Sequence, residues 1–187
     1  MRPIVTIFTP VFPTDEEHPA FFLDRDDTLI FDVPYLREPE KVRLTPGAIA
    51  GLKRLRAAGW RLILVSNQSG VNRGKFTEEE LRAVLGRMND LLAEGGVQLD
   101  ALYNCPHTPD EHCRCRKPGI GLFEQAQRDF NIDMVHSVMC GDKPGDIQCG
   151  RAAGLRTIQI RLFPNSPYLD ADYVVNTIDE AASVLLG

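Results

Sequence analysis

Short apolar runs that end abruptly in polar residues recur along the chain and alternate with segments of helical periodicity. Runs such as Ala20 to Leu23 and Leu62 to Val65 predict strands buried on both faces, because a half-solvated strand would alternate apolar and polar positions. The pattern predicts strands over 20–23, 62–65, 99–103, 137–140, 157–160 and 173–175, and helices over 46–58, 78–92, 122–130, 145–153 and 178–186.

Two of the helices carry a start signal. Thr45 and Pro46 have the residue types of an N-cap and a first helical position, and Gly59 ends the same segment. Thr77 followed by Glu80 has the spacing of a capping box.

Alternating strands and helices with doubly buried strands predict an α/β fold, a doubly wound and mostly parallel sheet covered on both faces. We expect a single domain over 1–187 without a large cap domain, with 1–19 as an extended lead-in that contains a short edge strand. Ligands of such folds bind at the carboxyl ends of the strands.

The composition narrows the classes of partner. The 21 basic and 26 acidic residues give a net charge of −5, which argues against nucleic acid or an anionic membrane as the main partner. No apolar run reaches the ~20 residues of a membrane span, and the prolines near the N-terminus interrupt any secretory signal. We expect a cytoplasmic monomer, since a chain of 187 residues can bury a core unaided.

Polar side chains follow several of the predicted strands. Asp24 and Asp26 come directly after the first long apolar run, Ser66 follows the next, and Asp142 follows a later one. A phosphate dianion repels carboxylates, so hard oxygen ligands such as Asp24 and Asp142 predict a magnesium ion between them. Lys117 and Ser66 can hold the phosphoryl oxygens, which makes this a candidate phosphoryl-transfer site.

The order of these motifs resembles that of haloacid dehalogenase-like phosphatases, whose fold is Rossmann-like. The match consists of Asp24-x-Asp26-x-Thr28, Ser66, Lys117 and Gly141-Asp142-x-x-x-Asp146. The resemblance implies Asp24 as nucleophile, Asp26 as general acid and base, and magnesium held by Asp24, Asp142 and the backbone carbonyl of Asp26. It implies that Asp146 acts by hydrogen bonding rather than as a ligand.

Three of the five cysteines lie in one short segment. Cys105, His107, Cys113 and Cys115 provide the three thiolates and one imidazole of a closed tetrahedral zinc site, with His112 as an alternative ligand. Such a zinc would be structural and would order the loop that leads to Lys117.

The cysteine motif, with the Arg116-Lys117-Pro118 that follows, resembles two families in that superfamily. These are the D-glycero-D-manno-heptose 1,7-bisphosphate phosphatases and the histidinol-phosphate phosphatases. The resemblance implies a small phosphorylated sugar as substrate, with heptose 1,7-bisphosphate as the first choice and histidinol phosphate as the alternative. It also implies a substrate border at the loop from Asp32 to Tyr35. The expected substrate-binding residues are Thr28, Asn67, Gln68, Arg116 and Lys143.

One residue departs from the family pattern: Asp27 stands where glycine is usual. This leaves open a phosphatase-like scaffold that binds sugar phosphate without hydrolysing it. A phosphoryl-accepting signalling domain is a second alternative, since such modules also gather Asp, Ser or Thr, and Lys at the end of a parallel sheet.

Overall fold

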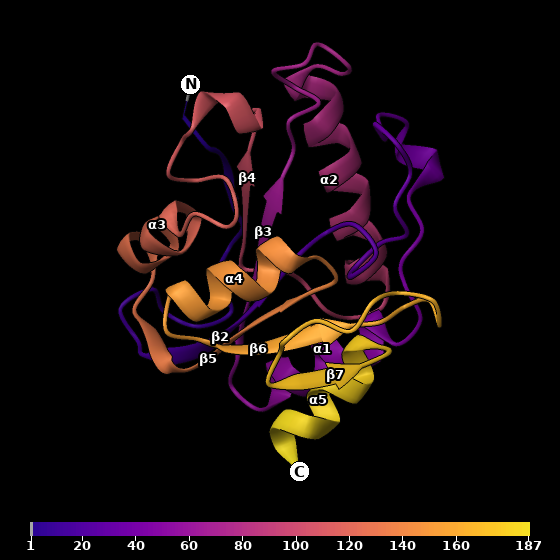
Figure 1. Ribbon diagram of the computed structural model, residues 1–187. Helices are drawn as coiled ribbons and strands as arrows, with labels where there is room; N and C mark the ends of the chain where they lie inside the picture. Colours follow the sequence, from indigo (N-terminus) through magenta and orange to yellow (C-terminus); the bar gives the residue numbers. More distant parts are fainter. Residues whose placement is uncertain (1) are drawn as a thin grey trace.

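The computed structural model describes residues 2–187 and shows a seven-stranded sheet with helices on both faces (Figure 1). The strand order is β1-β4-β3-β2-β5-β6-β7, and only β1 runs antiparallel to its neighbour. The strands are β1 (Ile4–Ile7), β2 (His18–Leu23), β3 (Arg61–Asn67), β4 (Ala101–Cys105), β5 (Ile132–Gly141), β6 (Arg156–Ile160) and β7 (Tyr173–Val175). The helices are α1 (Ala48–Ala57), α2 (Glu78–Glu94), α3 (Gly121–Asp129), α4 (Pro144–Ala152) and α5 (Ile178–Leu186).

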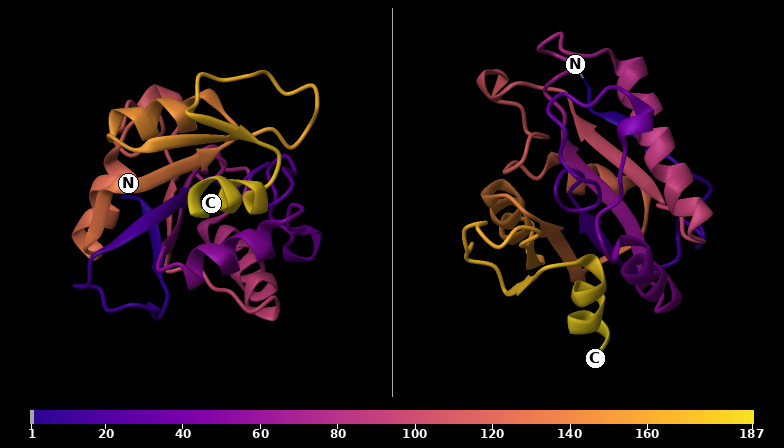
Figure 2. Two further views of the ribbon diagram at one scale, coloured as in Figure 1. Left: turned by 90° about the horizontal axis from the view of Figure 1, so that it is seen from below. Right: turned by 90° about the vertical axis from the view of Figure 1, so that its right-hand side faces the viewer.

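Two apolar layers sandwich the sheet, as the continuous apolar runs predict. Phe21 and Leu23 of β2 pack with α1, α2 and α5, whereas Phe22 points to the opposite face and packs with α3 and α4. The two helical layers lie on either side of the sheet in Figure 2. The predicted fold class is therefore confirmed.

Most element boundaries lie within a few residues of their predicted positions, and the capping box of α2 at Thr77 is confirmed. The predicted start of the first helix is wrong: α1 begins at Ala48 with Gly47 as its N-cap. Gly47 has a left-handed backbone with a φ of 75°, so the chain becomes helical only at Ala48, and the Thr45 hydroxyl instead donates to the Thr28 carbonyl at 2.7 Å.

The lead-in is attached to the sheet. Its short strand β1 pairs with β4, which confirms the expected edge strand. Farther along, the fully buried Arg61 donates to the carbonyls of Pro13 and Glu16 and lies over the ring of Phe130. Burying a guanidinium group is costly unless it is hydrogen-bonded. The lead-in carbonyls provide these hydrogen bonds, so they help to stabilise the burial of Arg61.

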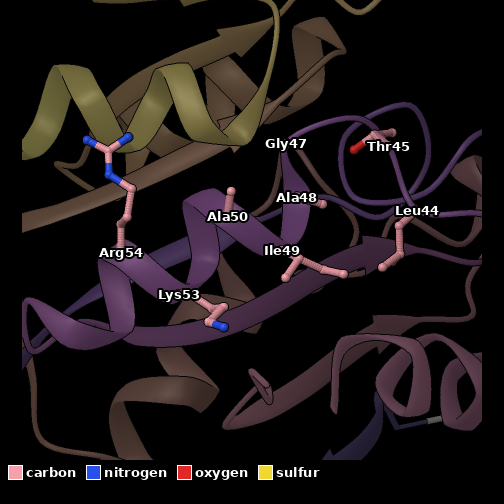
Figure 3. Close-up of a pocket in the computed structure, with 8 residues that line it drawn as sticks. All are labelled: Leu44, Thr45, Gly47, Ala48, Ile49, Ala50, Lys53 and Arg54. Atoms are coloured by element: carbon pink, nitrogen blue, oxygen red, sulfur yellow. The ribbon is translucent and has the colours of Figure 1, made fainter. Parts of the chain in front are cut away.

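A broad groove of about 650 Å³ follows α1 (Figure 3). Leu44, Ile49 and Ala50 contribute apolar surface, and the two nearby cations are Lys53 and Arg54. The groove contains no carboxylate and none of the side chains expected to carry chemistry. Within residues 2–187, no helix is both long enough and apolar enough to cross a membrane.

Candidate active site

The carboxyl ends of β2, β3 and β5 meet at the middle of the sheet, where Lys117 joins two carboxylates. The Asp24 backbone N–H donates to Cys140 O at 2.9 Å and so extends the pairing of β2 with β5. The Lys117 Nζ lies 2.7 Å from Asp24 Oδ1 and 2.6 Å from Asp146 Oδ1, and it donates to Val65 O at 2.8 Å. The side chains are buried, so this ion-pair network is shielded from solvent.

The charges of this network are set by burial and by mutual attraction. Burial alone would lower the pKa of Lys117, but Asp146 and Asp24 outweigh it and raise that pKa above its ordinary value. Burial opposes ionisation of Asp24, yet Lys117 holds the pKa of this carboxyl below its usual range. Asp24 is therefore a carboxylate at neutral pH, as a nucleophile must be.

The backbone of Lys117 is fixed by the side chain of Asn67, the last residue of β3. Asn67 Oδ1 accepts from Lys117 N at 2.9 Å, and Asn67 Nδ2 donates to Lys117 O at 3.0 Å. The amide thereby satisfies both backbone groups of a loop residue that has no strand partner.

Asp146 connects Lys117 to the start of α4. Its Oδ2 accepts from the Lys143 backbone N–H at 2.9 Å, in the capping arrangement that begins the helix. A Cβ at position 141 would overlap the Asp146 carboxyl group, so the glycine there makes room for it. Asp146 thus pairs with Lys117 and accepts a hydrogen bond from the start of α4, and its expected role stays a prediction.

Asp26 lies beside the network in a separate arrangement. Arg25 Nε donates to Asp26 Oδ1 at 2.8 Å, and Arg25 Nη2 donates to Asp26 Oδ2 at 3.0 Å. Gln68 Nε2 donates to Asp26 Oδ2 at 3.3 Å and to Ser66 Oγ at 2.8 Å. Asp26 is thus held in a fixed orientation at the edge of the cleft.

The carboxylate of Asp142 joins those of Asp24 and Asp146 at the carboxyl end of the sheet, and the three together could hold a divalent cation. Asp24, Asp142 and Asp146 each offer an oxygen within 4.8 Å of the others. Asp142 Oδ1 is buried and has no hydrogen-bond partner among residues 2–187. Burial and the nearby Asp24 raise the pKa of Asp142 to about 8, a cost that a cation would offset. A set of hard oxygen ligands with one unsatisfied member fits magnesium.

Two small hollows adjoin these side chains. The inner one, of about 70 Å³, is lined by Asp24, Asp26, Ser66, Asn67, Lys117, Lys143, Gly145 and Asp146. The outer one, of about 120 Å³, is lined by Arg25, Asp26, Asp32, Val33, Tyr35, Asn67, Gln68, Ser69, Gly70 and Phe76. The hollows share Asp26 and Asn67, so a ligand could extend from one into the other. Both are far smaller than the groove along α1, but unlike that groove they are lined by predicted site residues.

Two of the expected substrate-binding residues do not line either hollow. Thr28 is fully buried, and its carbonyl accepts from Thr45. Arg116 donates to the carbonyl of His107 at 3.0 Å, so it supports the cysteine-rich loop. Conversely, the sequence motifs do not indicate a role for Arg25, which contacts Asp26 in the structure. Its position between two candidate catalytic aspartates was the available signal, because a cation there can contact either one.

The four residues of the predicted zinc site lie together. The sulfur atoms of Cys105, Cys113 and Cys115 are 3.3–3.6 Å apart, and His107 Nδ1 lies 3.3 Å from Cys105 Sγ and 3.2 Å from Cys115 Sγ. Zn–S distances of about 2.3 Å place tetrahedral ligands roughly 3.5–3.8 Å apart, so the cluster fits a metal ion closely.

The thiol chemistry of this cluster also suits a metal. A hydrogen bond from Cys105 lowers the pKa of Cys115 to about 5, which makes Cys115 a thiolate at neutral pH. None of the five cysteines is joined in a disulfide within residues 2–187. His112 does not belong to the cluster, and His107 is the imidazole that does.

Comparison with known proteins finds phosphatases that are similar to this chain over most of its length. A family model described as HAD-hydrolase-like matches residues 114–162. The D-glycero-beta-D-manno-heptose-1,7-bisphosphate 7-phosphatase of Yersinia pestis is 44% identical over 172 residues, covering 86% of this chain and 91% of that protein. The protein of the same name from Escherichia coli O6:H1 is 39% identical over 171 residues, covering 86% and 90%. The D,D-heptose 1,7-bisphosphate phosphatase from B. bronchiseptica, solved with magnesium and phosphate, has a TM-score of 0.81 at 30% identity, covering 90% of this chain and 98% of that one.

The sheet, the aspartates at its centre and the matching family model define a haloacid dehalogenase-like phosphatase, a phosphoric monoester hydrolase. Within that class, the chain belongs to the D-glycero-D-manno-heptose-1,7-bisphosphate 7-phosphatase family. The resemblance identified from the sequence is confirmed, and a signalling domain without turnover is not supported.

Proposed function

We propose that this phosphatase hydrolyses D-glycero-D-manno-heptose 1,7-bisphosphate to the 1-phosphate in a magnesium-dependent reaction. The observation that carries the chemistry is the convergence of Asp24, Asp26 and Lys117 on one hollow at the centre of the sheet. The names of the relatives support the substrate, since proteins 36–44% identical to this chain are heptose-bisphosphate 7-phosphatases.

Asp24 is the proposed nucleophile. One of its carboxylate oxygens forms a bond to phosphorus as the bond from phosphorus to the sugar oxygen breaks, which gives an aspartyl-phosphate. Asp26 donates a proton to the departing sugar oxygen. In the second step Asp26 accepts a proton from water, the water oxygen bonds to phosphorus, and phosphate leaves as the Asp24 carboxylate is restored.

Other residues hold the reacting groups. Ser66 and Lys117 line the inner hollow, and we propose that both hydrogen-bond phosphoryl oxygens there. Lys117 already touches Asp24, so a phosphoryl group that reaches the nucleophile also reaches the cation. Arg25 and Gln68 orient Asp26 toward the boundary between the hollows, where the leaving oxygen would lie.

Asp24 and Asp142, with the backbone carbonyl of Asp26, would hold the magnesium ion. When bound, it neutralises charge on the phosphoryl group so that an anionic nucleophile can approach. Zinc in the cluster of Cys105, His107, Cys113 and Cys115 would be structural, because four protein ligands leave no position for water.

The volumes of the hollows agree with a small substrate. The inner hollow, of about 70 Å³, is the smaller of the two and is lined by Asp24, so we propose that it receives the transferred phosphoryl group. The remainder of the substrate would therefore lie in the outer hollow and beyond it. We propose that Asn67, Gln68 and Lys143 contact it, since all three line these hollows.

The test is phosphate release in the presence of magnesium, with both anomers of heptose 1,7-bisphosphate and with histidinol phosphate, using Asp24→Asn as the blank. A kcat/KM at least 100-fold higher for a heptose bisphosphate supports the proposal. A preference for histidinol phosphate would refute the substrate while leaving the phosphatase chemistry intact. Phosphate release by Asp24→Asn equal to that of the wild type would refute the nucleophile.

A further inference from the structure

Asp27 adopts a backbone conformation that few residues other than glycine accept. Its φ is +52°, and its N–H donates to Ile30 O at 2.8 Å to close a tight turn directly after Asp26. Aspartate and asparagine tolerate the left-handed region better than other residues with a side chain. The turn therefore forms with aspartate present, and the side chain is available for another task.

The Asp27 carboxylate is used to hold the next loop. Its Oδ1 accepts from the backbone N–H of Asp32 at 2.9 Å. Asp27 lines neither the inner nor the outer hollow. Its side chain therefore makes a structural contact with a residue five positions along the chain. It does not line the hollow proposed to receive phosphate.

The loop held in this way forms one wall of the outer hollow. Asp32, Val33 and Tyr35 line that hollow, while the side chain of Leu36 is buried beyond them. Asp32 and Tyr35 are exposed, so packing contributes little to their order. Tyr35 also has a positive φ of 52°, a conformation that must be stabilised by its surroundings.

A second contact joins this loop to the opposite wall. The Lys75 ammonium lies 5.5 Å from the centre of the Tyr35 ring, within the range of a cation–π interaction. Lys75 belongs to the segment between β3 and α2, whose Gly70 and Phe76 line the hollow from the other side. The loop is thus attached through Asp27 at one end and Tyr35 at the other.

We propose that Asp27 is a positioning residue that keeps the loop from 31 to 35 closed against the outer hollow. It thereby raises affinity for the part of the substrate beyond the transferred phosphoryl group. This proposal for Asp27 rests on one part of the proposed function, namely that the outer hollow receives the leaving sugar. It also replaces the idea that Asp27 disables the enzyme, because its carboxylate is bound to Asp32 N–H and is absent from the cleft lining.

Two substitutions of Asp27 distinguish the effect of its side-chain hydrogen bond from the effect of its backbone conformation. Asp27→Gly accepts the positive φ without strain but removes the acceptor, whereas Asp27→Asn keeps an acceptor oxygen and tolerates the same φ. The first measurement is hydrogen exchange of the Asp32 amide by NMR. Exchange should become several-fold faster in Asp27→Gly and stay within twofold of the wild type in Asp27→Asn.

The second measurement is kinetic. Asp27→Gly should raise KM for the sugar bisphosphate about tenfold with kcat changed less than twofold, because the loop does not touch the reacting atoms. KM for methyl phosphate, which is too small to reach the loop, should be unchanged. Asp27→Asn should restore the wild-type KM for the sugar bisphosphate.

The proposal is overturned if Asp32 exchanges equally in all three proteins, or if Asp27→Gly raises KM equally for both substrates. It is also overturned if Asp27→Asn is as impaired as Asp27→Gly, because charge rather than the hydrogen bond would then matter. If the wild type does not accept the heptose bisphosphate, the substrate assignment fails separately, and the exchange measurement still decides the role of Asp27.

Discussion

Replacing Lys117 by methionine would remove the only cation that contacts both Asp24 and Asp146 within residues 2–187. The two carboxylates would remain buried without their shared partner, and Val65 O would lose its donor. Removing one member of a buried ion pair costs about 3–5 kcal/mol of the free energy of unfolding. With a urea m-value of about 2–3 kcal/mol/M, the unfolding midpoint should fall by roughly 1–2.5 M.

Lys143 provides a matched control in the same cleft. Its side chain is 53% exposed and its Nζ lies 3.9 Å from Asp142, so Lys143→Met should cost less than about 1 kcal/mol. Unfolding can be followed by the fluorescence of Trp60, the single tryptophan, which is 7% exposed. The experiment is done in EDTA so that bound divalent cations do not contribute. Equal and small losses for the two variants would refute the stabilising role of the buried network.

Other consequences concern catalysis and the metal sites. Asp26→Asn should lower kcat by about 10²–10⁴ while circular dichroism remains native, since only the proton donor and acceptor is lost; an unchanged kcat would assign that role elsewhere. Removing magnesium with EDTA should stop phosphate release, and adding it back should restore release; activity in EDTA would contradict a magnesium requirement. Cys113→Ser should lose the cluster metal, measured by mass spectrometry of the purified protein, and full metal content would refute its role as a ligand. Gly141→Ala should destabilise the protein by roughly 1–3 kcal/mol in urea unfolding, because the new methyl group overlaps the Asp146 carboxyl group; a neutral effect would show that Asp146 can move.

The sequence predicts the fold class well because strands buried on both faces leave unbroken apolar runs. It predicts β5 less well: the structure extends this strand back to Ile132, whereas the apolar run begins near Val138. Within the extension Ile132 is buried, but Val135 and His136 are exposed and Asp133 interrupts the apolar residues, so no continuous apolar run marks this part of the strand. The predicted start of α1 is wrong for a different reason: Gly47 has a left-handed backbone with a φ of 75°, which the sequence pattern does not reveal, so the helix begins only at Ala48.

The candidate active site also has residues that the sequence predicts and contacts that it does not predict. Residue types and motif order indicate Asp24, Lys117 and Asp142, and spacing indicates the cysteine cluster. Neither the motif order nor the spacing indicates that the Arg116 side chain donates to a backbone carbonyl in its own loop. Neither indicates that Arg25 donates hydrogen bonds to Asp26. Those contacts depend on where long side chains extend after folding, which a one-dimensional pattern does not contain.

The contact between Lys117 and Asp24 joins residues 93 positions apart in the chain. During synthesis on the ribosome, the nucleophile emerges long before its cationic partner and before β5, the strand that flanks it. A nascent chain that stops short of Lys117 would carry Asp24 without Lys117 and without Asp146, so it could not bury Asp24 in a neutralised ion-pair network. Activity is therefore coupled to completion of the central sheet, and truncated products should lack hydrolytic activity even though they contain the residue that attacks phosphorus.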